Sequence, residues 1–182
     1  MKNKILIAVV PLVICLAAST AFGQADQTGT VSVSLTVADV FTLALSKSSE
    51  NFTGTGIYPG ESVNNEGNPI VCNVKSNYGA VWYLKIKDDH ALANATDTIP
   101  QASFLHQSTG GAGTHADAAY TAFTGTNAAG TIATFYTSTT AEGTNSTTGT
   151  SINSNLKVNV PTTQKRGTYT CTVTYTLSAT GP

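Results

Sequence analysis

Charged residues are scarce in this chain: only 10% of its 182 positions are Asp, Glu, Lys or Arg. Nucleic-acid binding depends on clustered Lys and Arg side chains that neutralise phosphates, and nine such residues, offset by ten acidic ones, form no basic cluster. Apolar residues at helical spacing over ten or more positions are also lacking, which argues against α-helices. Composition and pattern therefore disfavour nucleic-acid partners and a helical fold.

The N-terminus has the three-part pattern of a secretory signal peptide. Lys2 and Lys4 precede an apolar run over residues 5–16, and small residues follow that run. The run is shorter than the roughly 20 residues that a membrane-spanning helix needs. Lipidation at Cys15 is a weaker alternative, because the bulky Ile14 does not suit the position before a modified cysteine. The sequence therefore predicts an exported protein.

We expect residues 1–25 to be removed, by cleavage after Gly23 or after Ala25. Residues 26–182 then form a single domain with seven basic and ten acidic side chains. No other segment is apolar enough to span a membrane. The predicted location is secreted or cell-surface, with the periplasm as the alternative.

The rest of the chain consists of short segments in which apolar and polar residues alternate, separated by clusters of Gly, Asn, Ser and Pro. A period of two predicts β-strands with one buried face. The clearest strands are expected at residues 30–37, 41–45, 70–75, 80–87, 152–160 and 169–177, with weaker ones at 119–123 and 131–137. The first two are either one bent strand or two, and 70–75 should form a hairpin with 80–87. The fold class is therefore all-β.

Two stretches near residues 106–118 and 138–150 consist mainly of Gly, Ala, Ser, Thr and Asn, with almost nothing apolar. We expect both to be flexible surface loops. The three histidines, His90, His106 and His115, all lie in loop-like sequence, and no convergent acid, base and nucleophile is visible. The chain is therefore not expected to be an enzyme, and no cofactor or metal is expected.

Cys72 and Cys171 remain once the signal peptide is removed, and both lie on the apolar faces of expected strands. In an exported protein a disulfide between them is the preferred interpretation, and a buried pair of free thiols is the alternative. A metal site is disfavoured because no third and fourth ligand accompany the pair.

Three features resemble the immunoglobulin pattern: Cys72, Trp82 ten residues later, and the run Gly167-Thr168-Tyr169-Thr170-Cys171. In that pattern the tryptophan packs on an inter-sheet disulfide, and a tyrosine two residues before the second cysteine forms a corner. The resemblance implies an Ig-like antiparallel β-sandwich with one disulfide. It also implies that Trp82 and Tyr169 belong to the core.

A second resemblance is to exported bacterial sandwich proteins of the WxL-like surface type. The matching stretches are Tyr58-Pro59-Gly60-Glu61, residues 75–86 (KSNYGAVWYLKI), Val160-Pro161 and residues 167–177 (GTYTCTVTYTL). Such proteins associate with the cell surface, so this resemblance implies a surface location.

The functional prediction is a non-catalytic structural or adhesion-type protein that self-associates or joins other surface proteins in an extracellular assembly. Sandwiches can assemble by strand addition at open edges. The alternative is a carbohydrate-binding module that recognises surface glycans. Its candidate binding stripe is Tyr83, Lys85 and Lys87, which alternate with apolar residues on one strand. Trp82 is either a core residue or a sugar-stacking platform.

Overall fold

The computed structural model describes residues 29–52, 56–124 and 130–181. The expected signal peptide and its two candidate cleavage sites lie outside these residues. The described chain divides into two units, residues 29–36 and a sandwich body of residues 37–181, and each is considered by itself. No helix in the described part of the chain has the length and apolar character needed to cross a membrane.

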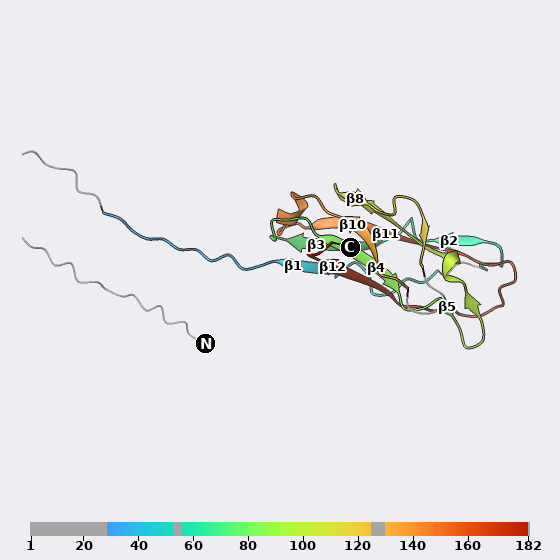
Figure 1. Ribbon diagram of the computed structural model, residues 1–182. Helices are drawn as coiled ribbons and strands as arrows, with labels where there is room; N and C mark the ends of the chain where they lie inside the picture. The colour runs from blue at the N-terminus through green and yellow to red at the C-terminus, as the bar shows by residue number, and fades with distance from the viewer. Residues whose placement is uncertain (1–28, 53–55, 125–129, 182) are drawn as a thin grey trace, which may run out of the picture. The chain divides into compact units, whose positions relative to one another are not determined.

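Nearly all regular structure in the sandwich body is β, as the alternating pattern predicts (Figure 1). The strands are β1 (Phe41–Leu45), β2 (Ser62–Asn64), β3 (Ile70–Ser76), β4 (Tyr83–Asp88), β5 (Leu92–Ala93), β6 (Thr98–Ile99), β7 (Phe104–Gly110), β8 (Thr114–His115), β9 (Thr121–Ala122), β10 (Ala133–Thr137), β11 (Thr150–Asn159) and β12 (Val173–Ser178). Two 3-10 turns, η1 (Gln101–Ser103) and η2 (Glu142–Thr144), interrupt them.

The strands form two main antiparallel sheets. The first has the order β1-β3-β11-β7-β9, with β2 paired to the end of β11, and the second has the order β12-β4-β10-β8. A short β5-β6 ribbon stands apart from both. The all-β prediction is therefore confirmed, and the arrangement is that of a β-sandwich.

The core lies between the two sheets because alternate residues of the central strands are apolar. In β3 every second side chain from Ile70 is buried, and in β4 the same holds for Leu84 and Ile86. Phe135 of β10 and Ile152 of β11 are also fully buried in the same cluster. These side chains remove apolar surface from water, which stabilises the packed sheets.

The predicted hairpin of residues 70–75 and 80–87 is wrong. β3 belongs to the first sheet and β4 to the second, so the intervening chain crosses from one sheet to the other. Trp82 lies at this crossing and is fully buried, with its ring 5.6 Å from that of Tyr136. The crossing is fixed by the Trp82 N–H, which donates to Ser138 Oγ at 2.8 Å.

Other expected segments also differ. Residues 104–110 form β7, where a loop was predicted from residue 106, because the inward positions of this strand include His106 and Ser108. Inward polar side chains hide the alternation of a strand from a search for apolar periodicity. The loop expected at 138–150 contains η2 and the buried Glu142. Residues 29–40 form no strand.

Candidate strand-binding groove

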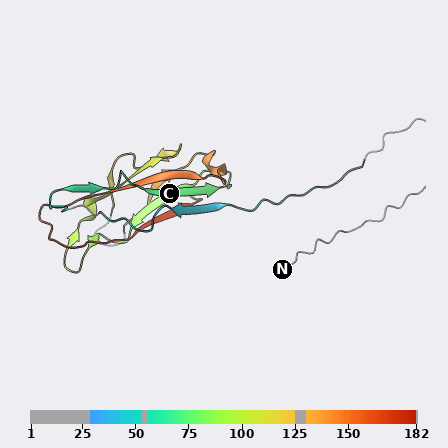
Figure 2. The same ribbon diagram turned by 180° about the vertical axis from the view of Figure 1, so that it is seen from behind.

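The sandwich is open along one side, where β1 and β12 lie side by side (Figures 1 and 2). Within the described chain β1 pairs only with β3, and β12 pairs only with β4. Each strand therefore presents one unpaired backbone edge to the same side of the molecule. An unpaired edge offers free N–H and C=O groups to another strand.

Inward side chains at this side are incompletely covered. Leu43 of β1 and Val173, Tyr175 and Leu177 of β12 pack against the core but are only half-buried. Leu45 is 43% exposed, although its neighbour in the sheet, Cys72, is fully buried. The core thus continues to this side without a strand that closes it.

A groove with a volume of about 1010 Å³ runs between the sheets at this opening. Its first wall includes Ile70, Phe104, Leu156 and Val158, which come from the first sheet, and its second includes Tyr169, Cys171, Val173 and Tyr175 from β12 and the chain before it. The groove exists because β1 ends at Leu45 and only the three-residue β2 continues the sheet edge beside the end of β11.

Polar groups of the groove are held at its rim by partners within the chain. Lys47 Nζ lies 2.7 Å from Glu50 Oε2, and Asn65 Nδ2 donates to the same oxygen at 2.8 Å. Burial raises the pKa of Glu50, but the hydrogen bonds from Lys47 and Asn65 outweigh burial and hold this pKa below its ordinary value. Lys165 pairs with Asp97 at 2.8 Å. The walls are therefore apolar and much of the rim charge is paired.

The predicted disulfide is wrong: Cys72 and Cys171 are both free thiols. Tyr175, not Cys171, reaches the part of the first sheet next to Cys72, because its hydroxyl lies 2.7 Å from Ser154 Oγ and Ser154 pairs with Ile70. Four residues of extended chain cover about 13 Å, whereas the Cα atoms of a disulfide lie within about 7 Å. The two cysteines thus lie at different levels of the sandwich.

Neither thiol has the properties of a catalytic nucleophile. Burial raises the pKa of Cys72 to about 12 and, with the nearby carboxylates of Asp89 and Asp88, raises the pKa of Cys171 to about 12 as well. A thiol that stays protonated near neutral pH reacts slowly. Cys171 nevertheless lines the groove.

Tyr169 packs against the core while its hydroxyl donates a 2.8 Å hydrogen bond to the carbonyl of Lys165. The bond anchors the chain that enters the second groove wall. Trp82 is fully buried, so its indole is closed to a sugar ring. Its Nε1 donates to the Glu142 carbonyl at 3.4 Å.

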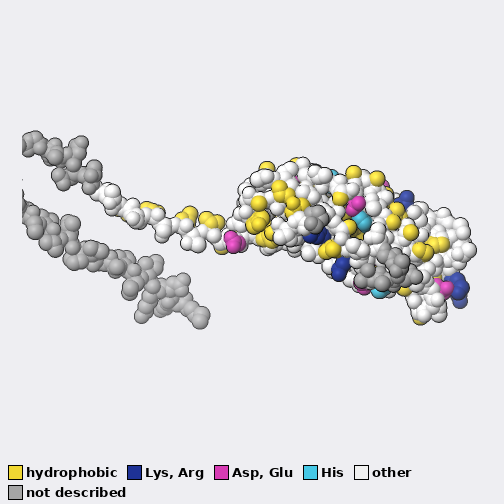
Figure 3. Space-filling model, in the orientation of Figure 1, with side chains coloured by type: hydrophobic (Ala, Val, Ile, Leu, Met, Phe, Trp, Pro, Cys, Tyr) yellow, Lys and Arg dark blue, Asp and Glu magenta, His cyan; other side chains and the backbone are white. Residues whose placement is uncertain are grey.

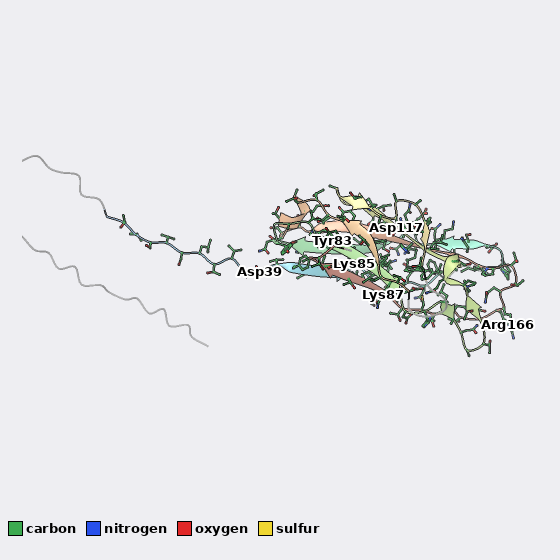
Figure 4. The ribbon with its side chains drawn as sticks, viewed as in Figure 1. Asp39, Tyr83, Lys85, Lys87, Asp117 and Arg166 are labelled. Atoms are coloured by element: carbon green, nitrogen blue, oxygen red, sulfur yellow. The ribbon has the colours of Figure 1, made fainter. Side chains whose placement is uncertain are left out.

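Tyr83, Lys85 and Lys87 follow one another along β4 on the outer face of the second sheet (Figure 4). All three are half-buried, and their neighbours on β12 include Thr174 and Thr176. Lys85 Nζ donates to the carbonyl of Gly181 at 3.1 Å. The stripe therefore exists as a continuous row, away from the groove, with one of its ammonium groups bound by the chain itself.

A buried polar cluster, formed by Asp88, Gln101, His106 and Asp117, lies outside the groove walls. Gln101 Nε2 donates to Asp88 at 2.7 Å, and His106 Nδ1 lies 3.2 Å from an Asp117 oxygen. Burial lowers the pKa of His106, and the carboxylates of Asp117 and Asp88 act against that shift. No group of three or more potential metal ligands occurs among the described residues.

The other two histidines lie apart from the buried cluster. His115 belongs to β8 and contacts Ser108 Oγ at 2.9 Å, while His90 lies beside Asp89 at 3.6 Å near the surface. The three histidines thus have separate surroundings, and two of them are in strands where loops were expected.

Sequence reasoning missed the groove itself. The alternation of the last strand was visible, but nothing local shows that β1 and β12 meet at one side with no strand between them. In comparisons with known proteins the chain matches no protein-family model, no curated protein and no solved structure.

Proposed function

We propose that this protein is a non-catalytic structural subunit of an extracellular assembly, built as an Ig-like sandwich that accepts an additional β-strand in the groove between β1 and β12. The open groove is the observation that carries the proposal. The signal-peptide pattern supports the extracellular location.

The groove has the two features that strand addition requires. Unpaired backbone edges supply main-chain hydrogen bonds, and an apolar trough accepts alternate side chains of the incoming strand. The opposite edges of the two sheets are β9 and β8, each only two residues long. Very short edge strands discourage pairing, so association is expected on the side of β1 and β12.

Two contacts support the Ig-like interpretation. Tyr169 bonds back to the carbonyl four residues upstream, as the tyrosine corner of Ig sandwiches does. Trp82 is buried against the ring of Tyr136. In this chain, packing and hydrogen bonds stabilise the body without the inter-sheet disulfide.

A glycan-binding module is the alternative, with Tyr83, Lys85 and Lys87 as its surface. Its support is weaker, because Lys85 already bonds to Gly181 and the buried Trp82 cannot stack on a sugar. Binding of the purified protein on a glycan array, lost on Tyr83→Ala, is the result that favours this alternative.

The test of the assembly proposal is size-exclusion chromatography with light scattering on residues 26–182 over a wide concentration range. We expect multimers that Val173→Lys disrupts, because Val173 faces the groove. The matched control is Thr174→Lys on the exposed face of the same strand, which should leave assembly intact. A wild-type chain that stays monomeric at high concentration contradicts the proposal.

A further inference from the structure

Residues 30–37, named here the donor segment, carry an unpartnered row of apolar side chains. Val31, Val33 and Leu35 are 87%, 89% and 87% exposed, and Val37 is 71% exposed. Figure 3 shows hydrophobic side chains spaced along this extended chain. Four large aliphatic residues in one alternating row are more than the single exposed apolar side chains that ordinary surfaces carry.

The donor segment matches what the groove lacks. Its odd-numbered residues are aliphatic, its even-numbered residues are Thr or Ser, and it contains no charge. Successive side chains of a strand point to opposite faces, so a strand of this sequence places its aliphatic row between apolar walls and its hydroxyl row toward water. The groove walls, with Ile70, Leu156 and Val173, offer the complementary surface.

The chain that joins the donor segment to β1 is held extended. Asn77 receives the Val40 N–H at 2.7 Å through Oδ1, and its Nδ2 donates to the Ala38 carbonyl at 2.8 Å. The Asn77 N–H also donates to the Val40 carbonyl at 2.9 Å. A hairpin that returned the donor segment to its own β1 would need a turn at these residues, so these bonds favour insertion into a different molecule.

We propose that the donor segment of one copy inserts as a β-strand into the groove of a second copy. This inference rests on the proposed function and names the partner of the same groove. Because each copy has one donor segment and one groove, the contact is head-to-tail. Such a contact produces chains of subunits unless it closes into a ring.

The first experiment compares two double variants of residues 26–182 by light scattering. Val33→Asp with Leu35→Asp adds charges to the aliphatic row, and burying them should weaken self-association at least about 100-fold. Ser32→Asp with Ser34→Asp adds the same charge to the hydroxyl row and should keep the assembly. Circular dichroism checks that both variants retain the β fold.

The second experiment adds a synthetic peptide with the sequence of residues 30–37. The peptide should bind the Val33→Asp, Leu35→Asp chain, whose groove is empty, and a peptide with the same two Asp substitutions should not bind. With excess wild-type peptide the assembly of the unsubstituted chain should break into capped, shorter species.

The outcomes separate this inference from the proposed function. If both double variants assemble equally well while Val173→Lys does not, the groove accepts another strand and the donor segment is excluded. If the wild-type chain is monomeric but only the Asp-substituted chain binds the peptide, the segment occupies its own groove and insertion into a second copy is overturned. If the wild-type chain is monomeric and neither chain binds the peptide, both proposals fail.

Discussion

The Tyr175 hydroxyl lies 2.7 Å from Ser154 Oγ, and this contact joins β12 of the second sheet to β11 of the first. Ser154 is fully buried and faces the interior, while Tyr175 forms part of the groove wall. Burial raises the pKa of Tyr175, so the hydroxyl stays protonated and can donate. The pair holds the two sheets together next to the opening.

Tyr175→Phe should lower the free energy of unfolding by about 1 to 3 kcal/mol, because it leaves the buried Ser154 hydroxyl without this partner. Chemical denaturation followed by tryptophan fluorescence measures the change. Thr174→Val, on the exposed face of the same strand, should stay within about 0.5 kcal/mol of the wild type. An equal loss in both variants argues against an inter-sheet role for the Tyr175 hydroxyl.

Glu142 should make stability depend on acid pH. Burial alone raises its pKa, but hydrogen bonds from the Ala112 N–H, the Tyr136 hydroxyl and Thr139 outweigh burial and lower the pKa. A carboxylate with a lowered folded-state pKa stabilises the fold above its unfolded value, about 4.3, and this stabilisation is lost as pH falls through the folded value. The free energy of unfolding should therefore decrease below about pH 4.3.

Glu142→Gln should cost about 1 to 3 kcal/mol at pH 7, because hydrogen bonds to a charged acceptor are lost. The same variant should show a smaller further loss between pH 7 and pH 3 than the wild type. Urea titrations at the two pH values provide the measurement. If the Glu142→Gln chain loses as much stability in acid as the wild type, the pH dependence belongs to other groups.

Close packing of η2 predicts an effect of Gly143→Ala. A Cβ atom at Gly143 would overlap the backbone carbonyl of Ala80, and the Gly143 carbonyl already accepts from the Gly79 N–H at 3.0 Å. Overpacking of this kind costs about 1 to 3 kcal/mol. Gly67→Ala is the control, since nothing lies within 4 Å of its Cβ position. Thermal unfolding should separate the two variants clearly.

The free thiols predict a simple titration. Residues 26–182, purified without reductant and unfolded in denaturant, should contain two reactive thiols. In the native protein Cys72 should be unreactive, because it is fully buried. A count of zero in denaturant would restore the disulfide expected from the sequence.

The sequence predicts the central strands well because their buried positions are apolar. Cys72 and Val74 in β3 alternate with polar neighbours, and this pattern alone identifies a half-buried strand. In β7 the inward residues include His106 and Ser108, so the same criterion fails. The assignment of β3 and β4 to different sheets depends on how the chain crosses the core, which local pattern does not encode.

The disulfide and the groove depend on long-range register. Both cysteines face inward as expected, but their levels differ by several residues, and no spacing rule reveals that. The expected strand at residues 30–37 has the right pattern and no partner within the described chain. A strand pattern without a partner and a sandwich with an open side are separate observations, and only the structure brings them together.

Cross-linking between the donor segment and Cys171 is the most direct test of strand exchange. Single cysteines replace Val31, Val33, Leu35 or Val37 in turn, and Ser32, Ser34 or Thr36 as controls, in a mixture of nitrogen-14 and nitrogen-15 chains under mild oxidation. The account predicts disulfides between isotopically different copies from at least one aliphatic position and from none of the hydroxyl positions, all lost on Cys171→Ser. Cross-links from both rows alike, or assembled chains with no link to Cys171, would contradict it.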